Sequence, residues 1–119
     1  MFFTSVFATN NVKSVKVKKN YYKSNNTIDY YSIYEYNPQG QLIKKIYYKP
    51  NNTIGCYYIY EYNIQGQLIK KTLYNSDGSI DCYFIYEYNT QGQLIKKIIT
   101  DPTTLLVFIL FLNITPKAN

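Results

Sequence analysis

The sequence predicts an all-β protein, a twisted antiparallel meander of about three and a half tandem β-hairpin repeats of 26 residues each. Three observations lead to this fold class. A near-identical segment recurs at a fixed period, and the stretches between its turn residues are rich in β-branched and aromatic residues. No stretch of the repeats has the 3.6-residue apolar period of a helix. The length of 119 residues suits a single domain.

The repeat is most evident in the segments IYEYNPQGQLIKK, IYEYNIQGQLIKK and IYEYNTQGQLIKK, which occupy residues 33–45, 59–71 and 85–97. A degenerate half-unit precedes them, because KVKKNYYKSNN at 16–26 is similar to LIKKIYYKPNN at 42–52. The predicted parts are an N-terminal segment at 1–13, a repeat domain at 14–102 with units at about 28–53, 54–79 and 80–102, and an apolar tail outside the repeat at 103–119.

Each unit is predicted to contain two strands. In the second unit these are residues 54–62 and 68–74, which are dense in Ile and Tyr and are bounded by turn residues. We therefore expect six or seven strands in the repeat domain. Since successive strands are joined by short turns, they should pair antiparallel with their neighbours along the chain.

The turns between these strands are predicted to be three-residue loops with a glycine-type bulge. The segment Asn37-Pro38-Gln39-Gly40 suits a type I turn followed by a residue with positive φ. Asn52 stands where other turns have Gly, and Asn also tolerates that conformation. The turn positions predicted in this way are Asn37, Gly40, Asn63, Gly66, Gly78, Asn89 and Gly92.

Because the period of 26 is even, equivalent residues of successive units lie on the same face only if the two loops of a unit both have an odd number of residues or both have an even number. Loops of three residues set Asn63 opposite Gln67, Tyr60 opposite Lys70 and Cys56 opposite Tyr74. A residue's counterpart two strands away is then 24 residues further on, so each hairpin adds a stagger of two. A stagger of constant sign makes a sheet coil, so we expect a curling sheet rather than a flat plate.

This pairing predicts one face rich in tyrosine and one mixed face. In the second unit the first carries Ile54, Cys56, Tyr58, Tyr60, Tyr62, Leu68 and Tyr74, and the second carries Ile59, Glu61, Ile69, Lys71 and Leu73. So short a chain cannot cover both faces of a sheet, and we expect either an exposed tyrosine surface or self-association through it. The predicted interaction residues are Tyr34, Tyr36, Tyr58, Tyr60, Tyr62, Tyr86 and Tyr88, with a protein or a second copy of the chain as partner.

The composition argues against catalysis. The chain has no His, Arg or Trp, which excludes Ser-His and Cys-His chemistry and removes the commonest zinc ligand. Cys56 and Cys82 are one period apart, roughly 9–10 Å across the predicted sheet, so they are expected to be small core residues rather than a disulfide. Glu35, Glu61 and Glu87 recur in identical environments, which does not split their roles into acid and base. We predict no enzymatic activity, no catalytic residues, no cofactor and no metal.

The positive charge is concentrated near the N-terminus. Residues 1–27 hold five Lys and no acid, whereas the repeats that follow are nearly neutral overall. Nucleic acid is therefore not an expected partner of the repeats. An alternative reading is a weak nucleic-acid or membrane-surface binder that acts through this basic arm.

The two ends do not belong to the repeat. Residues 1–13 resemble the remnant of a secretory signal peptide, with Ala8 where a small residue precedes cleavage. The run from Leu105 to Leu112 is apolar throughout but shorter than the roughly 20 residues of a spanning helix. It could be a buried strand, a membrane anchor or a frameshifted end. The alternative function that follows is none at all, in a truncated or frameshifted fragment of a longer repeat protein.

The segment from Tyr60 to Leu68, YEYNIQGQL, resembles the YD or RHS class of tandem β-hairpin repeats. Residues 14–102 are also similar to a phytoplasma repeat family of unknown function, whose units resemble YEYNPQG-QLIKK-YYNPDGTI. This resemblance implies a wall-less bacterium that lives inside its hosts, and hence a secreted or cell-surface location rather than a cytoplasmic one. It implies no activity, and it assigns no catalytic residues.

Overall fold

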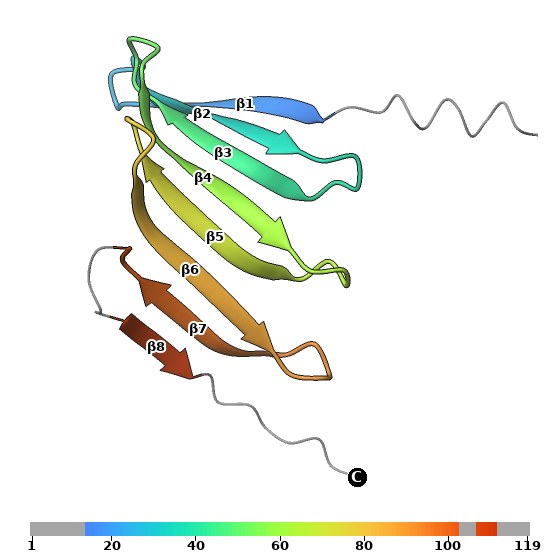
Figure 1. Ribbon diagram of the computed structural model, residues 1–119. Coiled ribbons are helices and arrows are strands. Elements are labelled where there is room, and N and C mark those ends of the chain that lie inside the picture. The colour runs from blue at the N-terminus through green and yellow to red at the C-terminus, as the bar shows by residue number, and fades with distance from the viewer. Residues whose placement is uncertain (1–13, 103–106, 112–119) are drawn as a thin grey trace, which may run out of the picture.

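The computed structural model describes residues 14–102 and the backbone of 107–111, and it is a single open β-sheet (Figure 1). Each strand pairs antiparallel with the next one along the chain, so the spatial order is the sequence order. The strands are β1 (Val15–Tyr22), β2 (Ile28–Tyr36), β3 (Leu42–Tyr48), β4 (Ile54–Tyr62), β5 (Leu68–Asn75), β6 (Ile80–Tyr88), β7 (Leu94–Thr100) and β8 (Val107–Phe111). The predicted all-β meander of hairpins is thus confirmed.

The turns of the repeat region share one backbone geometry. In the turn after β4, the Asn63 N–H donates to the Gln67 carbonyl at 3.0 Å and the Gly66 N–H donates to the Asn63 carbonyl at 3.0 Å. The fourth residue of each such turn has a positive φ, which is 83° at Gly66 and 67° at Asn52. Gly and Asn tolerate this left-handed conformation, and this explains their positions in the sequence.

Each of the six hairpins from β1 to β7 also contains a bulge one residue pair beyond its turn. In the β4–β5 hairpin, Tyr62 lies opposite Leu68 but Glu61 lies opposite Lys70, so Ile69 has no counterpart. The extra residue is always on the second strand of the hairpin. The six extra residues are Asp29, Ile43, Gly55, Ile69, Asp81 and Ile95.

The bulges correct the register expected from the sequence. The predicted pairs of Tyr60 with Lys70 and of Cys56 with Tyr74 are wrong, because Tyr60 lies opposite Lys71 and Cys56 opposite Asn75. The pairing of Asn63 with Gln67 at the turn itself is present. The physical reason is that Ile69 adds one residue to β5, which shifts every later pair of this hairpin by one.

The same shift corrects the predicted faces. Lys71 and Leu73 were expected on the mixed face, but they lie opposite Tyr60 and Tyr58 and so share the tyrosine-rich face. Tyr74 was expected beside them on the tyrosine-rich face and instead stacks on Tyr57 on the other side of the sheet. The side chains that follow Ile69 in this strand therefore exchange faces relative to the prediction.

The stagger of the sheet agrees with the sequence. Tyr34 on β2 lies opposite Lys45, which lies opposite Tyr58 on β4, so these counterparts are 24 residues apart although the repeat is 26. The unpredicted bulges shift the pairs of both hairpins of a unit by one residue each, so the stagger is unaffected by the register error. The strands rotate progressively along the sheet, and the turns β2–β3, β4–β5 and β6–β7 fan apart at one end of the strands (Figure 1).

The described part of the chain forms a single layer without an apolar core. Its buried residues are the polar Ser32 and Thr72, which are 0% and 3% exposed, and no described hydrophobic side chain is fully buried. Ile64 at a turn is 97% exposed. The sheet is therefore held by its ladders of hydrogen bonds and by contacts between side chains on its two surfaces.

Residues 107–111, within the apolar run that begins at Leu105, form a strand that pairs with β7. The rest of the predicted tail, at 103–106 and 112–119, and the predicted signal-peptide remnant at 1–13 lie outside the described residues. In the portion that the structure describes, no helix has the length and apolar character needed to cross a membrane.

The positive φ of the turns can be tested at Gly40, where a Cβ would meet no atom within 4 Å, so conformational strain alone would act. We expect Gly40→Ala to lower the free energy of unfolding by about 1–2 kcal/mol, because a non-glycine residue is strained there. Gly55→Ala is the matched control, since its Cβ would make an ordinary 3.6 Å contact with the Tyr47 carbonyl at a φ that alanine accepts. Urea unfolding measures both variants, and equal losses would contradict the turn assignment.

Candidate functional site

Aromatic rings form a continuous row on one surface, here called the tyrosine face. It consists of Tyr21, Tyr30, Tyr34, Tyr47, Tyr58, Tyr60, Phe84 and Tyr86, with the lysines that lie among them. The ring centroids are 6.3 Å apart between Tyr47 and Tyr58 and 6.4 Å apart between Tyr58 and Phe84. Their interplanar angles of 68° and 52° are those of edge-on and tilted contacts, which aromatic pairs favour. The row crosses the sheet from β1 to β6.

The seven tyrosines predicted as interaction residues divide into two groups. Tyr34, Tyr58, Tyr60 and Tyr86 belong to the tyrosine face, and each is half-buried among neighbouring rings and lysines. Tyr36, Tyr62 and Tyr88 lie at the strand ends beside the turns.

Two of the strand-end tyrosines connect successive hairpins. The Tyr62 hydroxyl donates to the Leu42 carbonyl at 2.7 Å, and the Tyr88 hydroxyl donates to the Leu68 carbonyl at 2.6 Å. These bonds bridge the places where neighbouring hairpins diverge. Tyr62 and Tyr88 therefore have a structural role, because their hydroxyls join neighbouring hairpins of the sheet.

A row of lysines that the sequence reasoning missed runs through the tyrosine face. The Lys45 Nζ lies 5.0 Å from the Tyr34 ring centre and 4.6 Å from that of Tyr47. The Lys71 Nζ lies 4.8 Å from Tyr58 and 4.5 Å from Phe84. Each distance is within the range of a cation–π contact. The signal that could have found them is the second Lys of every LIKK segment, once the bulge before it is known.

Partial burial changes the ionisation of this surface. Burial, together with the nearby Lys97 and Lys45 cations, lowers the pKa of the Lys71 ammonium. Burial also raises the pKa of the Tyr60 hydroxyl to about 12, although Lys45 opposes this shift. The face therefore holds like charges close together in a partly desolvated setting.

The opposite surface, here called the glutamate face, is more nearly neutral. Glu35, Glu61 and Glu87 lie on it opposite Lys44, Lys70 and Lys96. Lys96 and Glu87 are 3.7 Å apart, and Lys16 and Glu35 are 3.9 Å apart. Tyr57 and Tyr74 stack there at 4.7 Å with an interplanar angle of 6°. These glutamates are thus components of a charge-paired surface.

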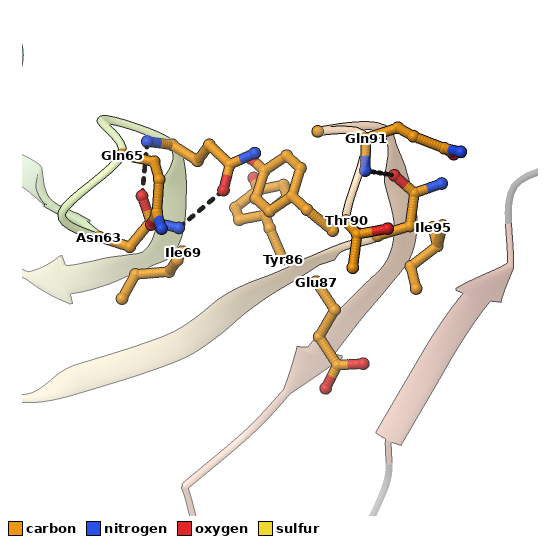
Figure 2. Close-up of a pocket in the computed structure, with 12 residues that line it drawn as sticks. Asn63, Gln65, Ile69, Tyr86, Glu87, Thr90, Gln91 and Ile95 are labelled. Atoms are coloured by element: carbon orange, nitrogen blue, oxygen red, sulfur yellow. Dashed lines mark hydrogen bonds between the residues drawn. The ribbon is translucent and has the colours of Figure 1, made fainter.

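A hollow of about 770 Å³ lies at the end of the strands where the turns fan apart, between the turn after β4 and the turn after β6 (Figure 2). Amide side chains line much of it, and several of them bond within their own turns. The Asn63 Nδ2 donates to the Gln67 Oε1 at 2.8 Å, and the Asn89 Oδ1 accepts from the Gln91 N–H at 3.0 Å. The polar groups of the hollow therefore serve turn structure, which leaves the tyrosine face as the stronger candidate site.

The two cysteines are separate free thiols on the tyrosine-rich side of the sheet. Burial raises the pKa of the Cys56 and Cys82 thiols, and the nearby Asp81 raises both further. Both thiols are therefore kept protonated and of low reactivity at neutral pH. Among the described residues, no group of three or more His, Cys, Asp or Glu side chains is placed to hold a metal ion.

A comparison with family models finds two matches, at residues 21–63 and 52–99. Both are to a family described as protein of unknown function (DUF2963). Together they cover residues 21–99, from the last two residues of β1 almost to the end of β7, and so include every ring of the tyrosine face. No curated protein in the comparison matches the chain.

The raised pKa of Tyr60 predicts a specific alkaline loss of stability. Tyrosine in an unfolded chain ionises near pH 10, whereas folded Tyr60 keeps its proton to about pH 12. The unfolded state binds fewer protons in this interval, so the free energy of unfolding should fall as the pH rises from about 10 to about 12. We expect a shallower fall for Tyr60→Phe, measured by urea unfolding across this range. Identical slopes for the two proteins would contradict a proton retained by burial.

Proposed function

The chain belongs to the DUF2963 family of proteins of unknown function, and we propose that it is a non-enzymatic interaction module that binds its partner through the tyrosine face. The observation that carries this proposal is the single-layer sheet. No described element covers the rings of Tyr58, Phe84 and Tyr86, which are half-buried only by their neighbours in the same layer. Tyrosine gains contact area on binding at a small cost in side-chain entropy, so such a surface suits protein recognition.

The non-enzymatic part of the proposal is supported by the repetition of the environments. Glu35, Glu61 and Glu87 each lie opposite a lysine of the same sequence motif, so they form one repeated row rather than two distinct positions for an acid and a base. The two thiols are shifted away from the reactive thiolate. The polar groups of this sheet therefore favour structure and binding over chemistry.

The partner is a protein or a second copy of the chain, and the site of action is outside the cell or at its surface. The support for this location is the resemblance of the IYEYN-x-QGQLIKK units to those of the phytoplasma repeat family. Mass spectrometry of secreted, membrane and cytosolic fractions tests it. A secreted or surface form supports the proposal, and a protein confined to the cytosol overturns this part of it.

The proposed binding surface predicts that Tyr60→Ser combined with Tyr86→Ser abolishes capture of the partner, because both changes remove rings from the tyrosine face. The matched control is Tyr57→Ser combined with Tyr83→Ser, which removes the same groups from the glutamate face. Partners are cross-linked to each protein and quantified by mass spectrometry, and sedimentation equilibrium detects self-association. Circular dichroism checks that each variant keeps its β spectrum.

Two results would overturn the binding surface. One is undiminished capture and unchanged self-association by the folded variant that lacks Tyr60 and Tyr86. The other is an equal loss in the control variant, since this would assign the effect to the sheet as a whole.

A further inference from the structure

The charges of the sheet are divided between its two faces. Four lysines, one on each odd-numbered strand from β1 to β7, lie on the tyrosine face and are here called the lysine column. They are Lys19, Lys45, Lys71 and Lys97, at intervals of 26 residues. Both ion pairs that the described part of the chain shows, Lys16–Glu35 and Lys96–Glu87, lie on the glutamate face instead.

The acids of the described strands do not oppose the lysine column. All three strand glutamates lie opposite lysines on the glutamate face, and Asp29 and Asp81 occupy bulges beside the turns at the other end of the strands. Burial raises the pKa of the Cys82 thiol and the nearby carboxylates of Asp81 and Asp101 raise it further, so these two acids lie toward the end of the strands that carries Cys82. The central part of the face therefore has a local positive charge, although the repeats are nearly neutral in sum.

The lysine column is held in place by rings. The Lys97 Nζ is 5.4 Å from the Phe84 ring centre and 5.7 Å from that of Tyr86, and Lys45 and Lys71 are each shared between two rings as well. Burial lowers the pKa of the Lys71 ammonium, and repulsion from Lys97 and Lys45 lowers it further. An anion placed over the column would relieve this repulsion, because an opposite charge nearby favours the charged form of lysine.

The spacing of the column suits an extended chain. Neighbouring members are two strands apart and staggered by two residues, so their Cα atoms are about 12 Å apart by standard sheet geometry. An extended peptide advances roughly 3.3 Å per residue, so acids about four residues apart would face successive lysines from the same side of that peptide.

The ring geometry favours a polypeptide over a single-stranded nucleic acid. Bases bind such surfaces by stacking on open ring faces. Here the rings of Tyr47, Tyr58 and Phe84 are tilted against one another, and lysine ammonium groups already lie over their faces. Carboxylates need only approach the ammonium groups, with tyrosine rings at their flanks.

We propose that the tyrosine face binds an acidic polypeptide segment in an extended conformation, whose carboxylates contact Lys45, Lys71 and Lys97. This inference rests on the proposed function and adds the chemistry of the partner. It differs from the basic N-terminal arm as a binding element, because the lysines concerned recur through the folded repeats.

The test measures fluorescence anisotropy of labelled poly-L-glutamate with the full chain and with two triple variants. One is Lys45→Gln, Lys71→Gln and Lys97→Gln. The matched control is Lys44→Gln, Lys70→Gln and Lys96→Gln, which removes the same charge from adjacent positions on the same three strands but from the glutamate face. We expect affinity to fall by roughly tenfold or more in the first variant and by much less in the control.

Equal losses in both variants would overturn the inference, since they would show attraction to net charge alone. Binding of poly-uridylate by the tyrosine face with no binding of poly-L-glutamate would overturn it in favour of nucleic acid. If the first triple variant lacks the β spectrum, Lys97→Gln and Lys96→Gln are compared instead, and an equal loss in these two again contradicts the proposal.

The proposed function can survive failure of this inference. If removal of Tyr60 and Tyr86 abolishes partner capture but removal of the three lysines changes neither capture nor poly-L-glutamate binding, the tyrosine face is a binding surface for a partner that is not acidic. If both sets of variants behave as the native protein does, the binding surface itself is misassigned.

Discussion

The second strand of every hairpin from β1 to β7 contains one residue more than its partner can match, and this residue decides which side chains share a surface. At Ile69 it moves Lys71 to the side of Tyr58 and Tyr60, and sends Tyr74 to the side of Tyr57. Because side chains alternate along a strand, the addition of one residue exchanges the faces of all that follow. The separation of the lysine column from the paired glutamates depends on this constraint. So do the stacked tyrosine pairs of the glutamate face.

A single layer must replace core burial with contacts that lie along its surfaces. Rings and ammonium groups provide many of these, and each aromatic or cation–π contact contributes about 0.5–1.5 kcal/mol. Where the hairpins fan apart, the Tyr62 and Tyr88 hydroxyls donate hydrogen bonds to the Leu42 and Leu68 carbonyls. Elsewhere in the sheet, backbone N–H groups make the corresponding bonds. These contacts recur between adjacent hairpins rather than across a centre, so stability is distributed along the array. The tyrosine face therefore contributes to the stability of the sheet and is also the surface for which we propose binding.

The repeat, its turns and its stagger could be predicted from the sequence because each has a local chemical cause. Gly66 and Asn52 stand at turn positions with a positive φ, which these residue types tolerate, and the period of 26 fixes which residues of successive units are equivalent. The glycine-type bulge of each turn could be predicted, but the additional bulge one residue pair beyond the turn could not, because Ile69, Gly55 and Asp81 have no common side-chain property. Each lies one residue pair beyond a turn, whatever the residue type at that position. The face of the lysine column could not be predicted for the same reason. In each LIKK segment the unpaired Ile exchanges the faces of the two lysines that follow it.

Each unit contains two bulges, so their effects on alternation cancel over one period and every unit repeats the orientation of the last. The insertion or removal of a whole unit would therefore keep this orientation in the units that follow. A gain of one unit would extend both surfaces without turning any side chain over, and it would add one lysine to the column at the established interval. On the binding proposed above, the avidity of such a protein for an elongated ligand would change in steps of whole units, with no amino-acid substitution at all.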